Sequence, residues 1–224
     1  MAKVPISRIS QQEILQLTNT PVAGLTDSDR DEMAIPSYLH GNPLIPWLMW
    51  KRYATIAELA QFSGSEHVLE FGCGIGLFLP TLTRACKTVS AIDLFPQYAQ
   101  ELCRKERLSV SFPQSLDSVA DQSLDAIIAA DVLEHVEPLS ECVKTFLHKL
   151  KPGGRIIVSG PTENLAYRIG RIAAGFGGKG DYHHTDIDNI EQQICRGGTE
   201  RQAIRKLPFS YLPALFKVIA FSKN

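Results

Sequence analysis

One stretch of this chain constrains its fold more than any other: an apolar run that passes through an acidic residue into three alternate glycines. Residues 68–78 read Val-Leu-Glu-Phe-Gly-Cys-Gly-Ile-Gly-Leu-Phe. This pattern predicts a strand that ends in a turn where the backbone itself approaches a ligand, because glycine accepts positive φ and carries no Cβ. We expect a helix to begin near Leu77, with its free amide groups and positive dipole end toward the bound molecule.

Three further blocks follow the glycine turn. Residues 88–92 read Thr-Val-Ser-Ala-Ile and lead into Asp93, which is placed to accept hydrogen bonds from the ribose hydroxyls of an adenosine. Residues 124–130 form a second apolar run, which leads into the segment Asp-Val-Leu-Glu-His-Val at 131–136. The last block, Leu-Lys-Pro-Gly-Gly at 150–154, reads as a helix stop before another strand.

As a set, the segments LEFGCGIG, AIDL, DAIIAADVLEHV and LKPGGRIIVS resemble the successive motifs of the class I S-adenosylmethionine-dependent methyltransferases. The resemblance covers residues 65–160 and, more loosely, the chain to its end. It implies S-adenosylmethionine as the cofactor and methyl transfer as the reaction. It also implies an α/β fold, a Rossmann-like doubly wound and mostly parallel sheet with an antiparallel strand pair at its C-terminal end.

Carried over position by position, the resemblance assigns the ribose to Asp93 and the adenine to Leu94. The segment 113–116 stands where the family often has an acidic adenine loop; we expect the Ser115 hydroxyl or a backbone amide to replace the missing carboxylate. The implied cofactor site comprises Glu70, Gly72, Cys73, Gly74, Gly76, Asp93, Leu94, Ser115, Leu116 and Asp131.

An NAD(P)-dependent oxidoreductase is the alternative that a glycine-rich turn also suggests. The dinucleotide fingerprint is G-x-G-x-x-G, with the pyrophosphate over the helix start. Here the spacing is G-x-G-x-G, and Leu77 occupies the position of the fingerprint's last glycine. Glu70 is an unfavourable neighbour for a pyrophosphate but a favourable one for a sulfonium and an ammonium group. The sequence therefore favours the methyltransferase.

Length and charge limit the remaining function classes. A chain of 224 residues makes one domain of ordinary size, which we divide into an N-terminal helical or lid segment, 1–62, and a cofactor-binding domain, 63–224. The formal net charge of -1 supports neither nucleic acid nor an anionic membrane as the main partner. We expect no transmembrane segment and no signal peptide. Oligomeric state stays open, including a homodimer.

The five scattered cysteines form no C-x-x-C pair, which argues against a disulfide framework or a zinc site and suits a reducing cytoplasm. We therefore expect no metal and a cytoplasmic location. Within the glycine turn, we interpret Cys73 as a small residue beside the cofactor rather than as a nucleophile.

Alternating strands and helices predict right-handed βαβ units and a parallel sheet covered on both faces. The ligand is expected beyond the carboxyl ends of the strands. Strands are expected near 67–71, 88–92, 108–112, 125–130 and 155–159, with a closing pair at 203–207 and 216–221. Helices are expected near 47–62, 77–85, 96–106, 137–150 and 165–174, with another that ends at about 196.

The candidate catalytic residues are histidines. His135 follows a predicted strand end, while His183 and His184 follow a glycine-rich stretch and are candidates for substrate binding or general-base work, or for a turn. Two adjacent histidines with no clear third ligand do not favour a metal. Asp131 has two interpretations: a cofactor contact, or a helix N-cap reciprocated by Glu134.

The aromatic run at 35–50 also has two interpretations. Trp47, Met49 and Trp50 either pack a helix against the sheet or belong to a lid over the substrate. The acceptor is expected to be a small molecule or an amphipathic, lipid-linked precursor, because segment 159–178 resembles bacterial methyltransferases associated with cell-surface sugars and lipids. Arg168 and Arg171 are either candidates for a phosphate contact or solvated side chains. A catalytically inactive cofactor-binding partner subunit stays open as a different class of function.

Overall fold

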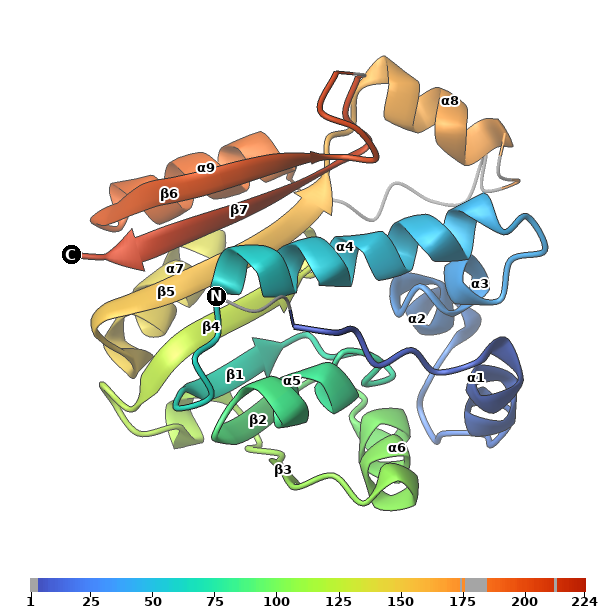
Figure 1. The fold of residues 1–224 in the computed structure, drawn as a ribbon, viewed down its shortest axis with the longest axis horizontal. Helices are drawn as coiled ribbons and strands as arrows, with labels where there is room; N and C mark the ends of the chain where they lie inside the picture. The colour runs from blue at the N-terminus through green and yellow to red at the C-terminus, as the bar shows by residue number, and fades with distance from the viewer. Residues whose placement is uncertain (1–3, 174, 176–184, 212) are drawn as a thin grey trace.

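A single mixed sheet organises the chain (Figure 1). The computed structural model describes residues 4–173, 175, 185–211 and 213–224. Within these residues the strand order is β3-β2-β1-β4-β5-β7-β6. The strands are β1 (His67–Phe71), β2 (Thr88–Ile92), β3 (Val110–Ser111), β4 (Leu124–Ala130), β5 (Leu150–Pro161), β6 (Thr199–Leu207) and β7 (Phe216–Lys223).

Strands β1 to β5 run parallel, while β7 pairs antiparallel with both β5 and β6. The predicted fold class is therefore confirmed, including the antiparallel pair at the C-terminal end. The central strand β4 is buried along almost its whole length, with residues 126–130 all in the interior. A continuous apolar run of this kind is typical of a parallel strand with helices on both faces.

Helices cover both faces of the sheet. Figure 1 shows α4 and α5 in front of the sheet and α7 and α9 behind it, and the buried side chains divide between two apolar clusters accordingly. The helices are α1 (Gln11–Thr18), α2 (Asp27–Glu32), α3 (Ile35–Tyr38), α4 (Leu44–Ala60), α5 (Leu79–Ala85), α6 (Gln97–Glu106), α7 (Leu139–Lys149), α8 (Leu165–Ala173) and α9 (Ile187–Arg196), with 3-10 turns η1 (Leu116–Ser118) and η2 (Leu133–His135).

Two strands differ from the sequence expectation. The strand expected at 108–112 is reduced to the two residues of β3 at the sheet edge. The segment expected only as a helix stop, 150–154, instead begins β5, because Leu150 pairs with Leu124 before the register shifts to Arg155 opposite Ala126. Gly153 adopts φ +72°, and its conformation accompanies this irregular start. Proline and glycine therefore mark a bulge here as well as a helix end.

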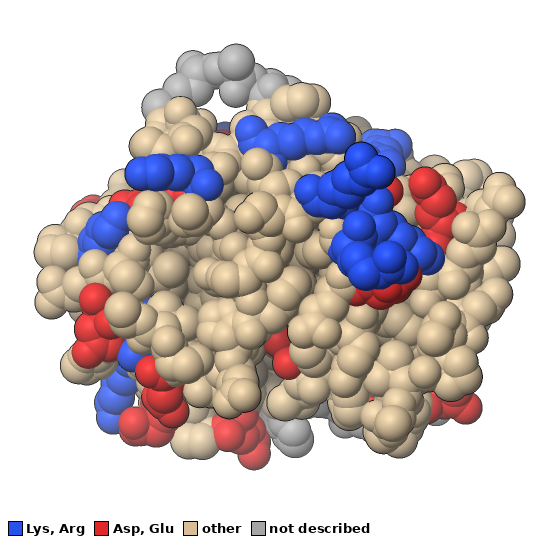
Figure 2. Space-filling model, turned by 90° about the horizontal axis from the view of Figure 1, so that it is seen from below, with Lys and Arg blue, Asp and Glu red and all other residues tan. Residues whose placement is uncertain are grey.

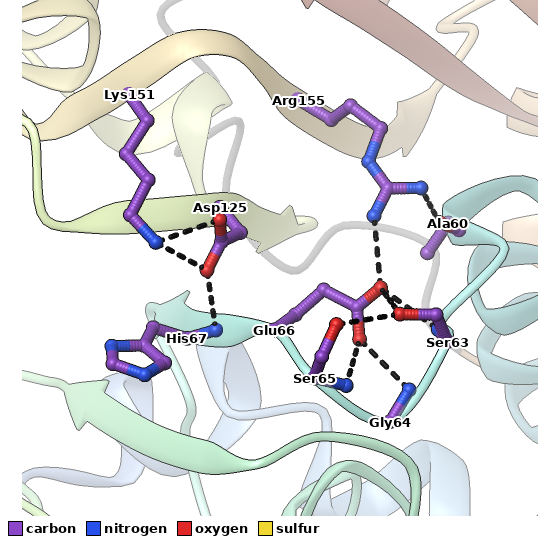
Figure 3. A network of polar contacts seen from close by, with 9 residues as sticks. All are labelled: Ala60, Ser63, Gly64, Ser65, Glu66, His67, Asp125, Lys151 and Arg155. Atoms are coloured by element: carbon purple, nitrogen blue, oxygen red, sulfur yellow. Dashed lines mark hydrogen bonds and ion pairs between the residues drawn. The ribbon is translucent and has the colours of Figure 1, made fainter.

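The amino-terminal edge of the sheet is closed by a polar network (Figure 3). The Glu66 carboxylate accepts hydrogen bonds from the backbone amides of residues 63, 64 and 65 and from the Ser63 hydroxyl, at 2.8–3.1 Å. Arg155 lies 3.5 Å from Glu66 Oε1 and donates to the Ala60 carbonyl at the end of α4. The network therefore joins α4, the turn before β1 and β5.

A second carboxylate at this edge ties three strands together. Asp125, near the start of β4, accepts hydrogen bonds from the His67 amide at 2.8 Å and from Lys151 Nζ at 2.8 Å to each oxygen. These contacts link β1, β4 and β5 at their amino-terminal ends (Figure 3). The amino-terminal edge is thus fixed by carboxylates.

Figure 2 shows the molecule from below the view of Figure 1, and this face carries charged side chains of both signs. Figure 2 shows the larger group of Lys and Arg right of centre, and Asp and Glu mostly toward the lower left. Binding a phosphate backbone requires a basic stripe, and this face, as far as its described residues extend, mixes both signs. No helix in the described part of the chain combines the length and apolar character needed to cross a membrane.

We predict that Glu66→Gln lowers the free energy of unfolding by about 1–3 kcal/mol, because a buried carboxylate that accepts several hydrogen bonds is replaced by an amide that cannot accept them all. Burial alone would raise the pKa of Glu66, but the hydrogen bonds from Ser63 and Gly64 outweigh burial and hold the pKa below its ordinary value of 4.5. Urea unfolding at several pH values measures the effect.

The sign of the pH dependence follows from the lowered pKa of Glu66. Its contribution to stability is present above the unfolded-state pKa and is lost as pH falls through the folded-state pKa. The difference between the parent chain and Glu66→Gln should therefore shrink in acid. The exposed Glu106→Gln is the matched control and should unfold like the parent. Equal stability of Glu66→Gln and the parent at neutral pH would contradict the prediction.

Candidate active site

A cavity of about 530 Å³ opens at the carboxyl ends of β1, β2 and β4. Residues 29–38, from α2 to α3, form its opposite wall, and Figure 1 shows these helices beyond the strand ends. Its described lining includes Asp29, Met33, Ala34, Tyr38, Arg52, Tyr53, Phe71, Gly72, Cys73, Gly74, Ile75, Ile92, Asp93, Leu94, Phe95, Gln114, Ser115, Leu116, Asp117, Ala130, Asp131, Val132, His135, Val136 and Thr145.

The glycine turn forms the floor of this cavity. The amides of Gly72 and Cys73 donate to the Ile92 carbonyl at 2.8 and 3.2 Å, which joins the ends of β1 and β2. Gly72 has φ +74°, and a Cβ built there would overlap the Val132 side chain. A glycine is therefore required at this position both by backbone conformation and by space.

Asp93 ties the turn to the second strand. Its Oδ2 accepts the Gly74 amide at 2.7 Å and its Oδ1 accepts the Phe95 amide at 3.0 Å. Each carboxylate oxygen retains a further lone pair for a ligand hydroxyl. The adjacent Leu94 is 92% exposed on the cavity rim. A carboxylate beside an exposed apolar side chain is suited to bind the ribose hydroxyls and the flat base of a nucleoside.

Two of the predicted cofactor residues do not line the cavity. Gly76 faces α6 instead, because a Cβ at this position would lie 2.9 Å from Ala99 Cβ. Glu70 is buried, and its Oε2 has no hydrogen-bond partner. Burial first, and then the Asp93 charge, raises the pKa of Glu70 well above its ordinary value, while Arg52 opposes the shift. The other predicted cofactor residues lie in the cavity wall.

Arg52 on α4 is the functional residue that the sequence interpretation missed. Its side chain is buried, forms an ion pair with Asp131, and reaches the Tyr38 hydroxyl with Nη2 at 3.4 Å. Its guanidinium carbon lies 5.2 Å from the ring centroid of Tyr53, and its Nε has no hydrogen-bond partner. The available signal was a charge on an apolar helical face, three residues after Met49 and four before Ile56.

The helix-cap interpretation of Asp131 is wrong. Asp131 has φ +53°, and η2 begins two residues later without a side-chain cap. Its amide donates to the Ser159 carbonyl at 3.0 Å, and its Oδ1 accepts the Ser159 hydroxyl at 2.6 Å. The carboxylate is oriented by its contacts with the Ser159 hydroxyl and the Arg52 guanidinium. It therefore faces the cavity.

Glu134, the expected partner in that cap, is buried in η2, and its Oε2 has no hydrogen-bond partner. Burial raises the pKa of Glu134 to about 7, against a smaller lowering by its own backbone amide and by Arg52. A second interior carboxyl group thus lies close enough to Arg52 for the arginine charge to act on it.

The loop after β3 contributes Ser115, Leu116 and also Asp117 to the cavity wall. An acidic residue, Asp117 on η1, thus lies in the cavity wall one residue after the segment 113–116. Ser115 and Ser118 close this turn, with Ser118 Oγ donating to the Ser115 carbonyl at 2.7 Å.

Of the candidate catalytic residues, His135 lines the cavity. His183 and His184 lie outside the described residues. Among the residues that are described, no cluster of three His, Cys, Asp or Glu side chains is arranged to hold a metal ion.

The aromatic run at 35–50 is divided between the core and the surface. Met49 and Trp50 are buried, and Trp50 contacts the Tyr38 ring at 5.5 Å edge-on. Trp47 is partly exposed and lies 6.2 Å from the Phe209 ring. Within this run, Tyr38 reaches the cavity.

Comparison with known proteins places the chain among methyltransferases. Residues 49–194 match the family described as Methyltransferase domain. The ubiquinone biosynthesis O-methyltransferase of Xylella fastidiosa is 34% identical over 122 residues, which cover 50% of this chain and 48% of that protein. The protein-L-isoaspartate O-methyltransferase of Myxococcus xanthus is 37% identical over 112 residues, 47% of this chain and 50% of that protein. The chain thus spans about half the length of these curated relatives.

Solved structures extend the likeness of fold over most of the chain. The N-methyltransferase NodS of Bradyrhizobium japonicum, in complex with S-adenosyl-L-homocysteine, has a TM-score of 0.66 at 20% identity and covers 88% of this chain and 96% of its own. The [4+2]-cyclase SpnF also has a TM-score of 0.66, at 16% identity, and covers 100% of this chain and 99% of its own.

We predict that Arg52→Met and Asp131→Asn each lower the free energy of unfolding by about 2–4 kcal/mol, because each leaves one charge of a buried pair uncompensated. The double variant should be less destabilised than the sum of the two, with a coupling energy of about 1–3 kcal/mol. Urea unfolding of the four proteins measures the cycle.

The matched control combines Arg52→Met with Asp125→Asn, a carboxylate that pairs with Lys151 at the opposite edge of the sheet. These two changes should add, because distant sites with no shared partner act independently. Additive effects in the Arg52 and Asp131 cycle would show that the two side chains do not stabilise one another.

Proposed function

Because this chain belongs to the methyltransferase family that it matches over residues 49–194, we propose that it transfers a methyl group from S-adenosylmethionine to a small or amphipathic acceptor. The observation that carries the proposal is the geometry around Asp93. A carboxylate with spare lone pairs, held by the Gly74 and Phe95 amides, lies beside the exposed Leu94 on the cavity rim.

The residues present fit this cofactor. Asp93 would hold the ribose hydroxyls, and Leu94 and Leu116 would contact the adenine, with Asp117 beside them. At the other end, Arg52 lines the cavity, and its unpartnered Nε suits the methionine carboxylate. Glu70 lies behind the cavity lining, so we assign it no direct contact with the cofactor. A buried donor thus has hydrogen-bonding capacity that the methionine moiety would satisfy.

When bound, the cofactor supplies a methyl group on a cationic sulfur. The acceptor attacks the methyl carbon in line with its bond to sulfur, and that bond breaks. The chain contributes alignment and the exclusion of water, and Met33, Ala34 and Tyr38 on the wall opposite the strand ends support this role. A hydroxyl acceptor must also lose a proton. We assign this step to His135, because its imidazole lines the same cavity and histidine is the side chain that most often acts as a general base.

The cavity favours an uncharged or amphipathic acceptor over a polyanion. Among its described lining residues, Arg52 is the only lysine or arginine, and Asp131 neutralises it. Aromatic and aliphatic side chains line much of the remaining wall, which suits an O- or N-methylated ring, a sugar or a lipid-linked precursor. The five free cysteines support a reducing location, the cytoplasm.

A second candidate function is cofactor binding without methyl transfer. The likeness to SpnF over the whole chain favours keeping this candidate, because that protein is named a [4+2]-cyclase. The glycine turn, Asp93 and Arg52 would serve cofactor binding in either case. The two functions differ only on the acceptor side of the cavity, where His135 lies.

We predict that the full chain binds S-adenosylmethionine with micromolar affinity and that Asp93→Ala weakens binding by about 10–100-fold, because a charge-assisted pair of hydrogen bonds is lost. Isothermal titration calorimetry measures both affinities, with NADH titrated in parallel. Asp121→Ala is the matched control, since Asp121 is an exposed carboxylate that pairs with Lys149 and does not line the cavity.

The outcomes separate the cofactor classes. Binding of S-adenosylmethionine that is lost in Asp93→Ala and kept in Asp121→Ala supports the proposal, and circular dichroism establishes that both variants fold. No heat with S-adenosylmethionine in the folded parent chain would overturn it. Heat with NADH alone would reinstate the oxidoreductase.

We predict that His135→Gln leaves the affinity for S-adenosylmethionine within about twofold of the parent and lowers turnover of a hydroxyl acceptor by about 10²–10⁴-fold, the range for loss of a general base. The assay follows S-adenosylhomocysteine release over a panel of phenols, amines, sugars and lipid-linked precursors. Unchanged turnover in His135→Gln would remove the residue from the mechanism. No turnover in the parent with any acceptor would favour the cofactor-binding function.

A further inference from the structure

Helix α8 presents an apolar stripe to the outside of the molecule. Leu165, Ile169 and Ile172 are exposed by 73%, 57% and 67%. Spacings of four and three residues place them on one side of an α-helix. Three large aliphatic side chains in one row form a contiguous apolar patch, whereas the apolar residues of an ordinary surface are scattered singly. Such a patch is typical of a binding surface.

Contacts with the rest of the fold determine which side of α8 is exposed. The opposite side of α8 packs inward, where Tyr167 contacts the Phe216 ring at 5.6 Å edge-on and a Cβ at Gly170 would lie 3.9 Å from Leu215. Asn164 caps the helix by accepting the Tyr167 amide at 2.9 Å and donates to the Ala214 carbonyl at 2.7 Å. The helix is thus anchored by one side, and the exposed apolar side chains lie on the other.

Aromatic side chains are exposed on the segment that leads to these anchoring residues. Phe209 and Tyr211, between β6 and β7, stack at 5.5 Å, and both are exposed. Trp47 on α4 lies 6.2 Å from Phe209, and Lys51 Nζ lies 4.9 and 5.2 Å from these two rings. Rings combined with a cation are the side chains that favour the interface between lipid headgroups and acyl chains.

The charges beside the stripe are basic. The sequence of α8 contains two arginines and no acidic residue, and Arg168 is exposed one residue before Ile169. Two carboxylates of neighbouring elements have cationic partners, Glu58 at 3.6 Å from Arg205 and Asp188 with Lys217, and Glu163 precedes the helix. A helix with aliphatic residues on one side and the exposed Arg168 next to them complements an anionic lipid surface.

We propose that α8, together with the aromatic pair Phe209 and Tyr211, is a peripheral docking surface for an anionic phospholipid bilayer. The apolar side chains of α8 would enter the acyl boundary while Arg168 and Lys51 remain among the phosphates. Since α8 follows the carboxyl end of β5, this surface lies on the same edge of the sheet as the cavity (Figure 1). The proposal concerns binding alone and stands independently of methyl transfer.

The test is co-sedimentation of the full chain with vesicles, without cofactor or acceptor. One set contains phosphatidylcholine alone and the other contains added phosphatidylglycerol. We expect binding to the anionic vesicles that weakens as salt is raised. The triple variant Leu165→Gln, Ile169→Gln, Ile172→Gln should bind at least about tenfold more weakly, because each change removes the transfer of an aliphatic side chain from water.

The matched comparison is Ile169→Gln against Leu15→Gln, since both residues are exposed aliphatics on helices, at 57% and 49%. Only the first should reduce vesicle binding. Circular dichroism checks that the variants fold, and light scattering gives the mass of each. Equal binding by parent and triple variant, no binding by the parent, or a dimer that the triple variant dissociates would each overturn the proposal.

Discussion

The guanidinium of Arg52 is a cation held in an apolar interior, and the arrangement of the cavity depends on how its charge is balanced. Asp131 neutralises it from the end of β4, while Glu70 and Glu134 lie close enough for its charge to act on their pKa values. Removing such a charge from water is costly, so the surrounding groups must hold it in one geometry. Helix α4, otherwise a covering layer, thereby becomes part of the site.

Much of the fold could be predicted from sequence because the central strands are apolar runs bounded by turns. β1 and β2 have the expected bounds, and the ligand edge follows from the parallel order of the strands. Arg52 was missed for a physical reason. Its partner Asp131 lies far along the chain, and only tertiary packing brings a helix residue to a strand end. Likewise, the local spacing of Asp131 and Glu134 suggested a helix cap. The Asp131 carboxylate instead contacts the Ser159 hydroxyl and Arg52, which lie far from it in sequence.

The cavity has two halves of different origin. The glycine turn and Asp93 form one half, built from strand ends whose positions the sheet fixes. The other half comes from α2, α3 and the middle of α4, which precede the first strand. Proteins named for O-methylation, N-methylation and cyclisation all resemble this chain. Reaction type is therefore better sought in the second half than in the glycine turn.

The two edges of the sheet differ in how completely their polar side chains are hydrogen-bonded. The carboxyl edge carries charges whose hydrogen bonds are incomplete, as at Glu70, whereas the carboxylates of Glu66 and Asp125 at the other edge are saturated with donors. The chain thus keeps unsatisfied polar groups at one edge and saturated carboxylates at the other. For protein engineering, the saturated edge offers an anchor for attachment or immobilisation. Side chains of the cavity wall other than Arg52 and Asp131 can be varied in libraries, while that pair is kept because the fold depends on it.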